Sequence, residues 1–288
     1  MSENLYAIEC KNITHYYGNK KIYENLNFNA KIGKVTGLLG KNGVGKSTLI
    51  NILMGFLKPS SGECRIFGEI STNLSVETKA KIGLLYENHI SYDFMSISQI
   101  EKLYGAHYGN RWQKDRYYDL ISKLGVGYNQ KLSTLSNGQR SQVVLGLIFA
   151  SNPDLLILDD YAIGLDAGYR SLFVDYLRDF ISSGNKSVLM TTHIMADLEN
   201  LLDDIVVLQR KKEPYINEFS EFKRALKGVE CDLKFDEKEL QGEVTSVINL
   251  KNKKKIYGFF DMQKALNLGA KELDLSFEEA FLGLVGRY

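Results

Sequence analysis

One stretch near the N-terminus constrains this chain more than any other feature. Residues 40–48 read Gly-Lys-Asn-Gly-Val-Gly-Lys-Ser-Thr, which fits the phosphate-binding pattern G-x-x-x-x-G-K-[ST]. An apolar run at 35–39 precedes this loop, and apolar residues at helical spacing follow it from 47 to 56. The pattern predicts a buried strand, a glycine loop and a helix, in that order. An accidental glycine-rich turn is the alternative, and the motifs described below argue against it.

The residue types in this loop suit the binding of a nucleotide. Glycines allow a tight turn, so that successive N–H groups can point at phosphate oxygens, and the helix start adds further donors. Lys46 would contact the β- and γ-phosphates, and the Ser47 hydroxyl would bind Mg²⁺. We therefore expect a nucleotide site formed by Gly40, Lys41, Asn42, Gly43, Val44, Gly45, Lys46, Ser47 and Thr48.

Length and composition limit the possible classes of protein. The 288 residues suggest about two domains, and 44% hydrophobic with 25% charged residues is ordinary for a soluble globular protein. A net charge of +1 argues against a nucleic-acid partner, which usually needs a strong basic excess. The three cysteines, Cys10, Cys64 and Cys231, form no C-x-x-C pair, so buried free thiols in a reducing compartment are expected.

The N-terminus lacks the basic region followed by an apolar one that a signal peptide has. No uncharged apolar stretch approaches the ~20 residues that a membrane helix needs. The sequence therefore predicts a cytoplasmic chain that does not itself cross a bilayer.

The hydrophobic pattern predicts an α/β core over residues 1–210. Strands at 5–14 and 22–30, joined by a turn at 15–19, indicate a small antiparallel sheet beside the nucleotide core. After short strands at 62–68 and 80–87, strands and helices alternate, which predicts a mostly parallel sheet covered on both faces. The alternating segments are helix 139–150, strand 155–158, helix 169–181, strand 187–191, helix 194–202 and strand 205–208.

Two further parts surround this core. Residues of about 88–135 read as an inserted helical subdomain, with one helix opened by a capping box of Ser98 and Glu101 and a second helix at 112–124. Its many aromatic residues either line a groove for a partner's amphipathic helix or fill the subdomain's own core.

Residues 211–288 read as a small α+β accessory domain. It has strands at 229–235, 244–250 and 255–260 and helices at 261–268 and 277–285, the last opened by Ser276 and Glu279. The lysines within 251–255 indicate a solvated turn between two strands or, alternatively, a contact with an anionic surface.

Paired acids follow the apolar strand at 155–158. A buried strand would deliver both carboxylates to the edge of the sheet beside the phosphate loop. Asp159 would then help to hold Mg²⁺, and Asp160 would orient or deprotonate the attacking water. A solvated acidic turn is the alternative.

Several further motifs resemble those of ABC ATPases, in that family's order. Residues 135–139, Leu-Ser-Asn-Gly-Gln, resemble the LSGGQ signature, and 164–166 resemble the D-loop. Thr192-His193 resembles the switch histidine, Tyr17 matches the A-loop aromatic residue, and 82–87 resembles the Q-loop segment. The resemblance covers residues ~5 to ~210 and is more specific than any single motif.

The resemblance implies a P-loop NTPase fold of the ABC-ATPase type and two ATPase units packed head to tail. ATP bound by one unit would stack on Tyr17 and be closed over by the other unit's Ser136, Asn137, Gly138 and Gln139. His193 would contact the γ-phosphate, and Glu87 would contact Mg²⁺. ATP would hold the units together, and hydrolysis would release them; both a homodimer and a pair with a related ATPase fit.

This sequence departs from the family pattern at four positions. Asp160 stands where Glu is usual, Tyr161 where Pro is usual, Glu87 where Gln is usual, and Asn137 where Gly is usual. We expect slow hydrolysis, because a poorly placed base can cost ~10²–10⁴ in rate.

The ending at 275–281 resembles that of ATPases from ABC-2 exporters, and the composition resembles that of peptide exporters of Gram-positive bacteria. These features imply an ATPase that serves separate transmembrane permease subunits at the inner face of the membrane and exports a peptide, drug or lipid. A soluble ABC ATPase acting on the ribosome or DNA, and an ATP-gated binding module with little hydrolysis, are the alternatives.

Overall fold

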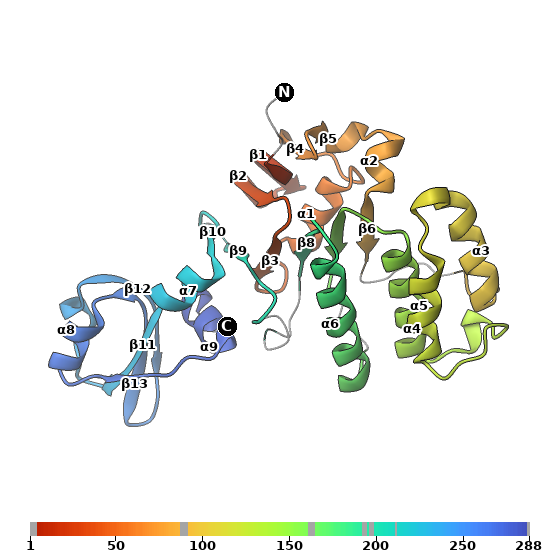
Figure 1. Cartoon of the computed structure of the whole chain (residues 1–288). Coiled ribbons are helices and arrows are strands. Elements are labelled where there is room, and N and C mark those ends of the chain that lie inside the picture. The colour runs from red at the N-terminus through yellow and green to blue at the C-terminus, as the bar shows by residue number, and fades with distance from the viewer. Residues whose placement is uncertain are drawn as a thin grey trace.

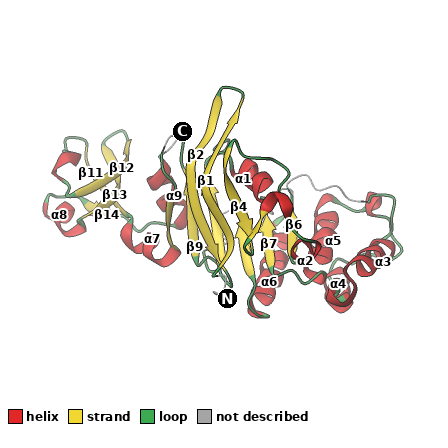
Figure 2. Cartoon of the chain, turned by 90° about the horizontal axis from the view of Figure 1, so that it is seen from above, coloured by secondary structure: helices red, strands yellow, loops and turns green. Residues whose placement is uncertain are grey.

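The computed structural model describes residues 5–86, 92–160, 165–191, 195, 199–210 and 212–286. Within these residues the strands form three separate sheets, and helices gather beside them. In Figures 1 and 2 the inserted helices lie at one end of the molecule, the C-terminal sheet lies at the other, and the nucleotide core lies between them.

The first sheet is antiparallel and has the strand order β2-β1-β4-β5. The expected turn at 15–19 is too long, because β1 continues to Tyr17 and the turn is confined to Gly18 and Asn19. Gly18 has a positive φ of 56°, which a two-residue hairpin turn requires. The strands are β1 (Tyr6–Tyr17), β2 (Lys20–Lys31), β4 (Ser61–Ile66) and β5 (Glu69–Ile70).

The central sheet has the order β10-β9-β3-β8-β7-β6. Its strands are parallel except for β10, which runs antiparallel to β9, so the expected mostly parallel sheet is confirmed. The strands are β3 (Val35–Gly40), β6 (Ile82–Leu85), β7 (Leu155–Leu158), β8 (Ser187–Met190), β9 (Asp204–Leu208) and β10 (Tyr215–Glu218).

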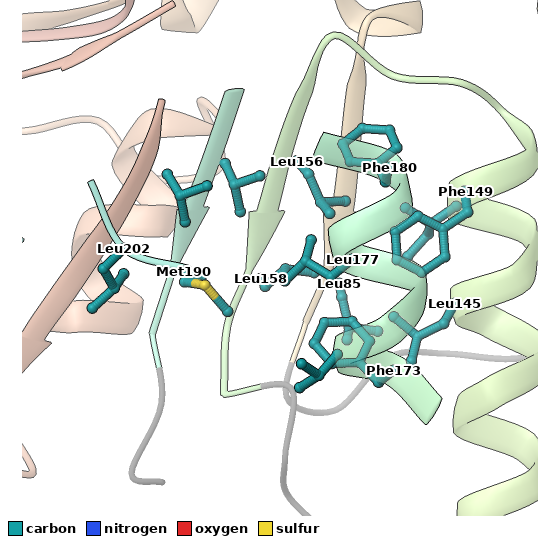
Figure 3. Packing of buried hydrophobic residues seen from close by; sticks show 14 of the residues in the cluster. Leu85, Leu145, Phe149, Leu156, Leu158, Phe173, Leu177, Phe180, Met190 and Leu202 are labelled. Carbon is teal, nitrogen blue, oxygen red and sulfur yellow. The ribbon is translucent and has the colours of Figure 1, made fainter. Parts of the chain in front are cut away.

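Helices cover both faces of this sheet, as expected. On one face, α5 (Asn137–Ala150) and α6 (Ala167–Ser182) pack on Leu156 and Leu158 (Figure 3). On the other face, Leu155 and Ile157 share a cluster with α1 (Lys46–Leu53) and the antiparallel sheet. The short helix α2 (Val76–Ala80) precedes β6. Of the helix expected at 194–202, residues 194 and 196–198 lie outside the described residues, and 199–201 form a turn.

The inserted part contains α3 (Ile97–Tyr108) and α4 (Lys114–Ser122). The expected capping box is wrong: Ser96 and Gln99 cap α3, not Ser98 and Glu101. Glu101 is instead buried, and it accepts hydrogen bonds from Trp112 Nε1 at 2.9 Å and from the Tyr118 hydroxyl at 3.3 Å.

The aromatic residues of this part lie both in its core and on its surface. Tyr117 is fully buried in the core between the helices, whereas Phe94 and Tyr128 are exposed. The subdomain therefore has an aromatic core and an aromatic surface at the same time.

The third sheet is antiparallel, with the order β12-β13-β11-β14. β13 spans Lys253–Phe260, so the solvated turn expected at 251–255 is wrong in part. Lys254 is buried in this strand, and its Nζ lies 2.7 Å from Glu237 Oε2. The other elements are β11 (Lys227–Asp232), β12 (Gly242–Asn249), β14 (Lys271–Glu272), α8 (Met262–Asn267) and α9 (Phe277–Val285), and the capping box of Ser276 and Glu279 on α9 is confirmed.

One helix joins this part to the core. Helix α7 (Phe219–Ala225) follows β10. The Phe219 ring packs against the ring of Phe277 on α9, with the ring centroids 4.8 Å apart. The division at residue 211 stays a prediction. β10 pairs with the central sheet, and the third sheet begins at Lys227.

The three cysteines are buried free thiols, as expected. Cys10 and Cys64 nevertheless face each other across β1 and β4, with their Sγ atoms 3.0 Å apart. Within the described part of the chain, none of the helices has the length and apolar character that crossing a bilayer requires.

Candidate functional site

The candidate site lies where three adjacent parallel strands end. β8 lies between β3 and β7 in the central sheet. The phosphate loop follows β3, Thr191 follows β8, and Asp159 and Asp160 follow β7. Because the carboxyl ends of parallel strands meet at one edge, sequence segments more than 100 residues apart converge there.

The phosphate loop has the backbone that its glycines predict. Gly40, Gly43 and Gly45 have positive φ values of 150°, 70° and 117°. A Cβ at Gly40 would lie 2.8 Å from the Leu208 carbonyl oxygen, so the residue also lacks room for a side chain. Val44 is buried in the core and anchors the loop, while Asn42 and Gly43 remain exposed.

Helix α1 begins directly after this loop. Its N-cap is Gly45, and no side chain of the described residues caps it. The first N–H groups of a helix have no partner within the helix, so they are available to an anion. Ser47 and Thr48 lie half-buried on this first turn.

Lys46 folds back over the loop. Its Nζ donates to the Gly40 carbonyl at 2.8 Å and lies 3.4 Å from the Lys41 carbonyl oxygen. Burial lowers the pKa of Lys46, and the charges of Asp160 and Asp159 oppose that shift. The cation and both acids therefore lie at the same edge of the sheet, where the sequence predicts the two carboxylates beside the phosphate loop.

Thr191 links the two acids, and the sequence analysis missed it. Its hydroxyl donates to Asp159 Oδ1 at 2.9 Å and accepts from the Asp160 N–H at 2.9 Å. The sequence feature that could have identified Thr191 is its place as a polar residue at the end of an apolar strand. The alternative of a solvated acidic turn is excluded, because both acids are buried.

Within the described part of the chain, one carboxylate oxygen of this group makes no hydrogen bond. Among the described residues, Asp159 Oδ2 is buried and has no hydrogen bond. A buried anionic oxygen is costly unless a cation or donor satisfies it, so this oxygen fits a bound metal ion. Asp160 has a positive φ of 51°, in a region where Asp is tolerated better than most side chains.

The signature segment forms the start of α5. Ser136 is the N-cap, and its Oγ accepts from the Gln139 N–H at 3.2 Å while Gln139 Oε1 accepts from the Ser136 N–H at 3.0 Å. Gly138 has no room for a Cβ, which would lie 2.7 Å from the Tyr169 ring. Asn137 is the first helical residue and has an ordinary negative φ, so the missing glycine causes no backbone strain there.

The remaining expected residues are only partly described. Tyr17 lies half-exposed at the end of β1, and the His15 ring packs edge-on against it at 4.9 Å. Asp166 of the D-loop segment caps α6 by accepting from the Tyr169 N–H at 3.0 Å. Glu87, Tyr161, Gly164, Thr192 and His193 lie outside the described residues.

Comparisons with known proteins agree with this geometry. The family model described as ABC transporter matches residues 23–162. Nod factor export ATP-binding protein I of Rhizobium johnstonii is 31% identical over 208 residues, which cover 70% of this chain and 66% of that protein. The protein of the same name from Burkholderia orbicola is 28% identical over 211 residues, covering 72% of this chain and 69% of that protein.

Solved structures show the same fold. An ATP-binding subunit of an ABC transporter superposes with a TM-score of 0.68 at 22% identity, covering 76% of this chain and 92% of that chain. A bacterial Atm1-family ABC exporter with ATP bound superposes with a TM-score of 0.65 at 19% identity, covering 78% of this chain and 40% of that chain. The chain therefore belongs to the ABC transporter family, as an ATP-binding domain of the kind that hydrolyses ATP to power transport.

Proposed function

We propose that this chain is the ATP-hydrolysing subunit of an ABC exporter and works as a head-to-tail dimer beneath separate membrane permeases. The observation that carries the proposal is the convergence of the phosphate loop, Thr191 and the two acids at one sheet edge. The export relatives named above support the direction of transport.

Each residue of the edge has a role in this proposal. The loop N–H groups and Lys46 bind the phosphates of ATP, and Tyr17 stacks on the adenine. Thr191 orients Asp159, whose free oxygen would hold Mg²⁺ together with Ser47 and Glu87. Bound Mg²⁺ neutralises phosphate charge. Asp160 orients or deprotonates the attacking water.

The signature completes the site from a second protomer. In the described residues, the side-chain hydrogen bonds of Ser136 and Gln139 stay within their own capping box, so these side chains do not tie the helix start to another element of the same chain. In the dimer, the signature of one protomer lies against the γ-phosphate that the other protomer's loop holds, through Ser136, Asn137, Gly138 and Gln139. His193 of the protomer that carries the loop contacts the same phosphate. A homodimer is the simplest form, and pairing with a related ATPase is the alternative.

Trapping the dimer tests this arrangement. Asp160→Asn removes the base and keeps the size of the side chain, so ATP should bind without being hydrolysed. Light scattering after gel filtration should give the mass of the 32.6 kDa chain without nucleotide and twice that mass with saturating Mg²⁺ and ATP. The double variant Lys46→Ala/Asp160→Asn should remain monomeric. A monomeric Asp160→Asn protein under saturating nucleotide would contradict the dimer.

The short Asp160 side chain should also limit the rate. Asp160→Glu extends the carboxylate by one C–C bond, roughly 1.5 Å, towards the γ-phosphate. We expect a higher steady-state rate of phosphate release, because a well-placed general base raises the rate by a factor of ~10²–10⁴. A rate that falls would show that the backbone at Asp160, with its positive φ, already places the shorter side chain correctly.

The membrane partner determines the cargo, which we propose is a peptide, drug or lipid. The chain would then lie at the cytoplasmic face, held there by its permease. Purification of a tagged chain from detergent-solubilised cells should recover a polytopic membrane protein in a fixed ratio. Recovery of ribosomes or DNA instead would favour a soluble ABC ATPase.

A further inference from the structure

We propose that Tyr23 is a positioning residue of the ATP site, because its hydroxyl holds the Gly45 carbonyl and so aims the phosphate loop. Tyr23 lies on β2, in the antiparallel sheet, whereas Gly45 ends the loop of the central sheet. The Tyr23 hydroxyl donates to the Gly45 carbonyl oxygen across the gap between the two sheets.

The position of Gly45 makes this contact consequential. Gly45 is the N-cap of α1, and its carbonyl also accepts the first helical hydrogen bond, from the Leu49 N–H at 2.9 Å. A carbonyl oxygen has two lone pairs, so Leu49 and Tyr23 together use both. The carbonyl is therefore held from two directions.

Fixing this carbonyl fixes the next N–H group. The Gly45 carbonyl and the Lys46 N–H belong to one planar trans peptide, in which they point in opposite directions. Tyr23 holds the carbonyl on the side of the antiparallel sheet, so the Lys46 N–H points to the other side. That N–H is one of the helix-start donors available to a phosphate.

The two residues are matched in size as well as in chemistry. A Cβ at Gly45 would overlap the Tyr23 hydroxyl and approach Ile22 Cγ2 to 2.7 Å. The glycine is therefore needed for its φ of 117° and for the close approach of the tyrosine. Burial also raises the pKa of Tyr23, so its hydroxyl stays protonated and can donate throughout the physiological pH range.

The contact also couples two parts of the nucleotide site. Tyr23 pairs with His15 across the hairpin, and the His15 ring packs against Tyr17, the residue proposed to stack on adenine. One hairpin thus carries both the adenine contact and the support of the phosphate loop. The inference rests on ATP binding by the loop and does not depend on the dimer or the cargo.

The hydroxyl can be removed without emptying the core. Tyr23→Phe keeps the ring among its apolar neighbours, and the Gly45 carbonyl keeps the helical hydrogen bond that it accepts from the Leu49 N–H. We therefore expect a folded variant whose loop is less well oriented. Tyr117→Phe is the matched control, because the Tyr117 hydroxyl donates to the Ile97 carbonyl at 3.0 Å in the inserted helices.

The experiment compares nucleotide affinity with stability. Tyr23→Phe should raise both the Kd for a fluorescent ATP analogue and the KM for ATP about five- to tenfold, the effect of one oriented hydrogen bond, and change kcat less than twofold. Its affinity for AMP, which lacks the β- and γ-phosphates, should not change. Tyr117→Phe should lower the melting temperature at least as much and leave both constants unaltered.

Three results would overturn the proposal. The first is wild-type affinity for ATP in Tyr23→Phe, and the second is an equal loss for AMP, which would place the effect at the adenine. The third is an equal loss in Tyr117→Phe, which would make the effect one of general stability. If Tyr23→Phe does not fold, Tyr23→Leu, which also lacks the hydroxyl, decides by the same criteria. Loss of ATP binding in Lys46→Ala tests the phosphate loop itself, independently of Tyr23.

Discussion

The two helices proposed to face the phosphates of ATP begin in opposite ways. Helix α1 starts at a glycine with a φ of 117°, and no side chain of the described residues caps it. Helix α5 starts at Ser136, whose capping box with Gln139 satisfies two backbone groups within the same chain.

This difference indicates how each helix start depends on a ligand. The start of α1 leaves N–H groups for an anion, so binding of ATP supplies the cap that the sequence omits. At the start of α5 the capping box satisfies two backbone N–H groups without a ligand, and α9 has the same kind of capping box. We infer that α1 is stabilised by its own nucleotide, whereas α5 is formed beforehand and offers a rigid surface to a second protomer's nucleotide.

Removing the lysine of the open helix start should have the largest effect. Lys46→Ala should lower the rate of phosphate release at least ~100-fold, because a cation aimed at the phosphates is lost. It should also abolish the rise in melting temperature that ATP gives the wild-type protein, since a ligand that binds the folded state stabilises it. Lys58→Ala, at an exposed lysine after α1, should change neither quantity. Stabilisation by ATP in Lys46→Ala would show that the loop binds without its lysine.

Removing the cap of the closed helix start should have an intermediate effect. Ser136→Ala and Ser276→Ala remove equivalent caps from α5 and α9, so each should cost about 1 kcal/mol, or ~2–4 °C in melting temperature. Only Ser136→Ala should also lower ATP hydrolysis, by ~10-fold or more, because Ser136 alone faces a nucleotide. Equal rates in the two variants would reduce Ser136 to a structural cap.

The sequence predicts the parts of this comparison that local patterns determine. Four apolar residues that end in two acids predict a short buried strand that delivers the acids to the phosphate loop, and β7 matches the expected range. The α9 capping box was equally readable, because Ser276 and Glu279 stand alone before one apolar run.

Tertiary contacts determine what the sequence could not show. Ser96 and Ser98 are both plausible caps, and the choice follows from the burial of Glu101 beside Trp112. Helix α7 is too short to be recognised by periodicity, and Phe219 forms its contact with a helix almost 60 residues later. The bond between Tyr23 and the phosphate loop likewise joins two sheets, so no spacing in the sequence reveals it.

The smallest effect should come from the residue at which the signature departs from its family. Asn137 is the first residue of α5 and has an ordinary φ, so a glycine there relieves no strain. Asn137→Gly should change the rate of ATP hydrolysis less than twofold and lower the melting temperature by no more than ~2 °C, the modest cost of glycine in a helix. Steady-state phosphate release and thermal melting measure both. A rise of tenfold or more would mean that the asparagine side chain obstructs the partner's nucleotide, and slow hydrolysis would then originate at α5 as well as at Asp160.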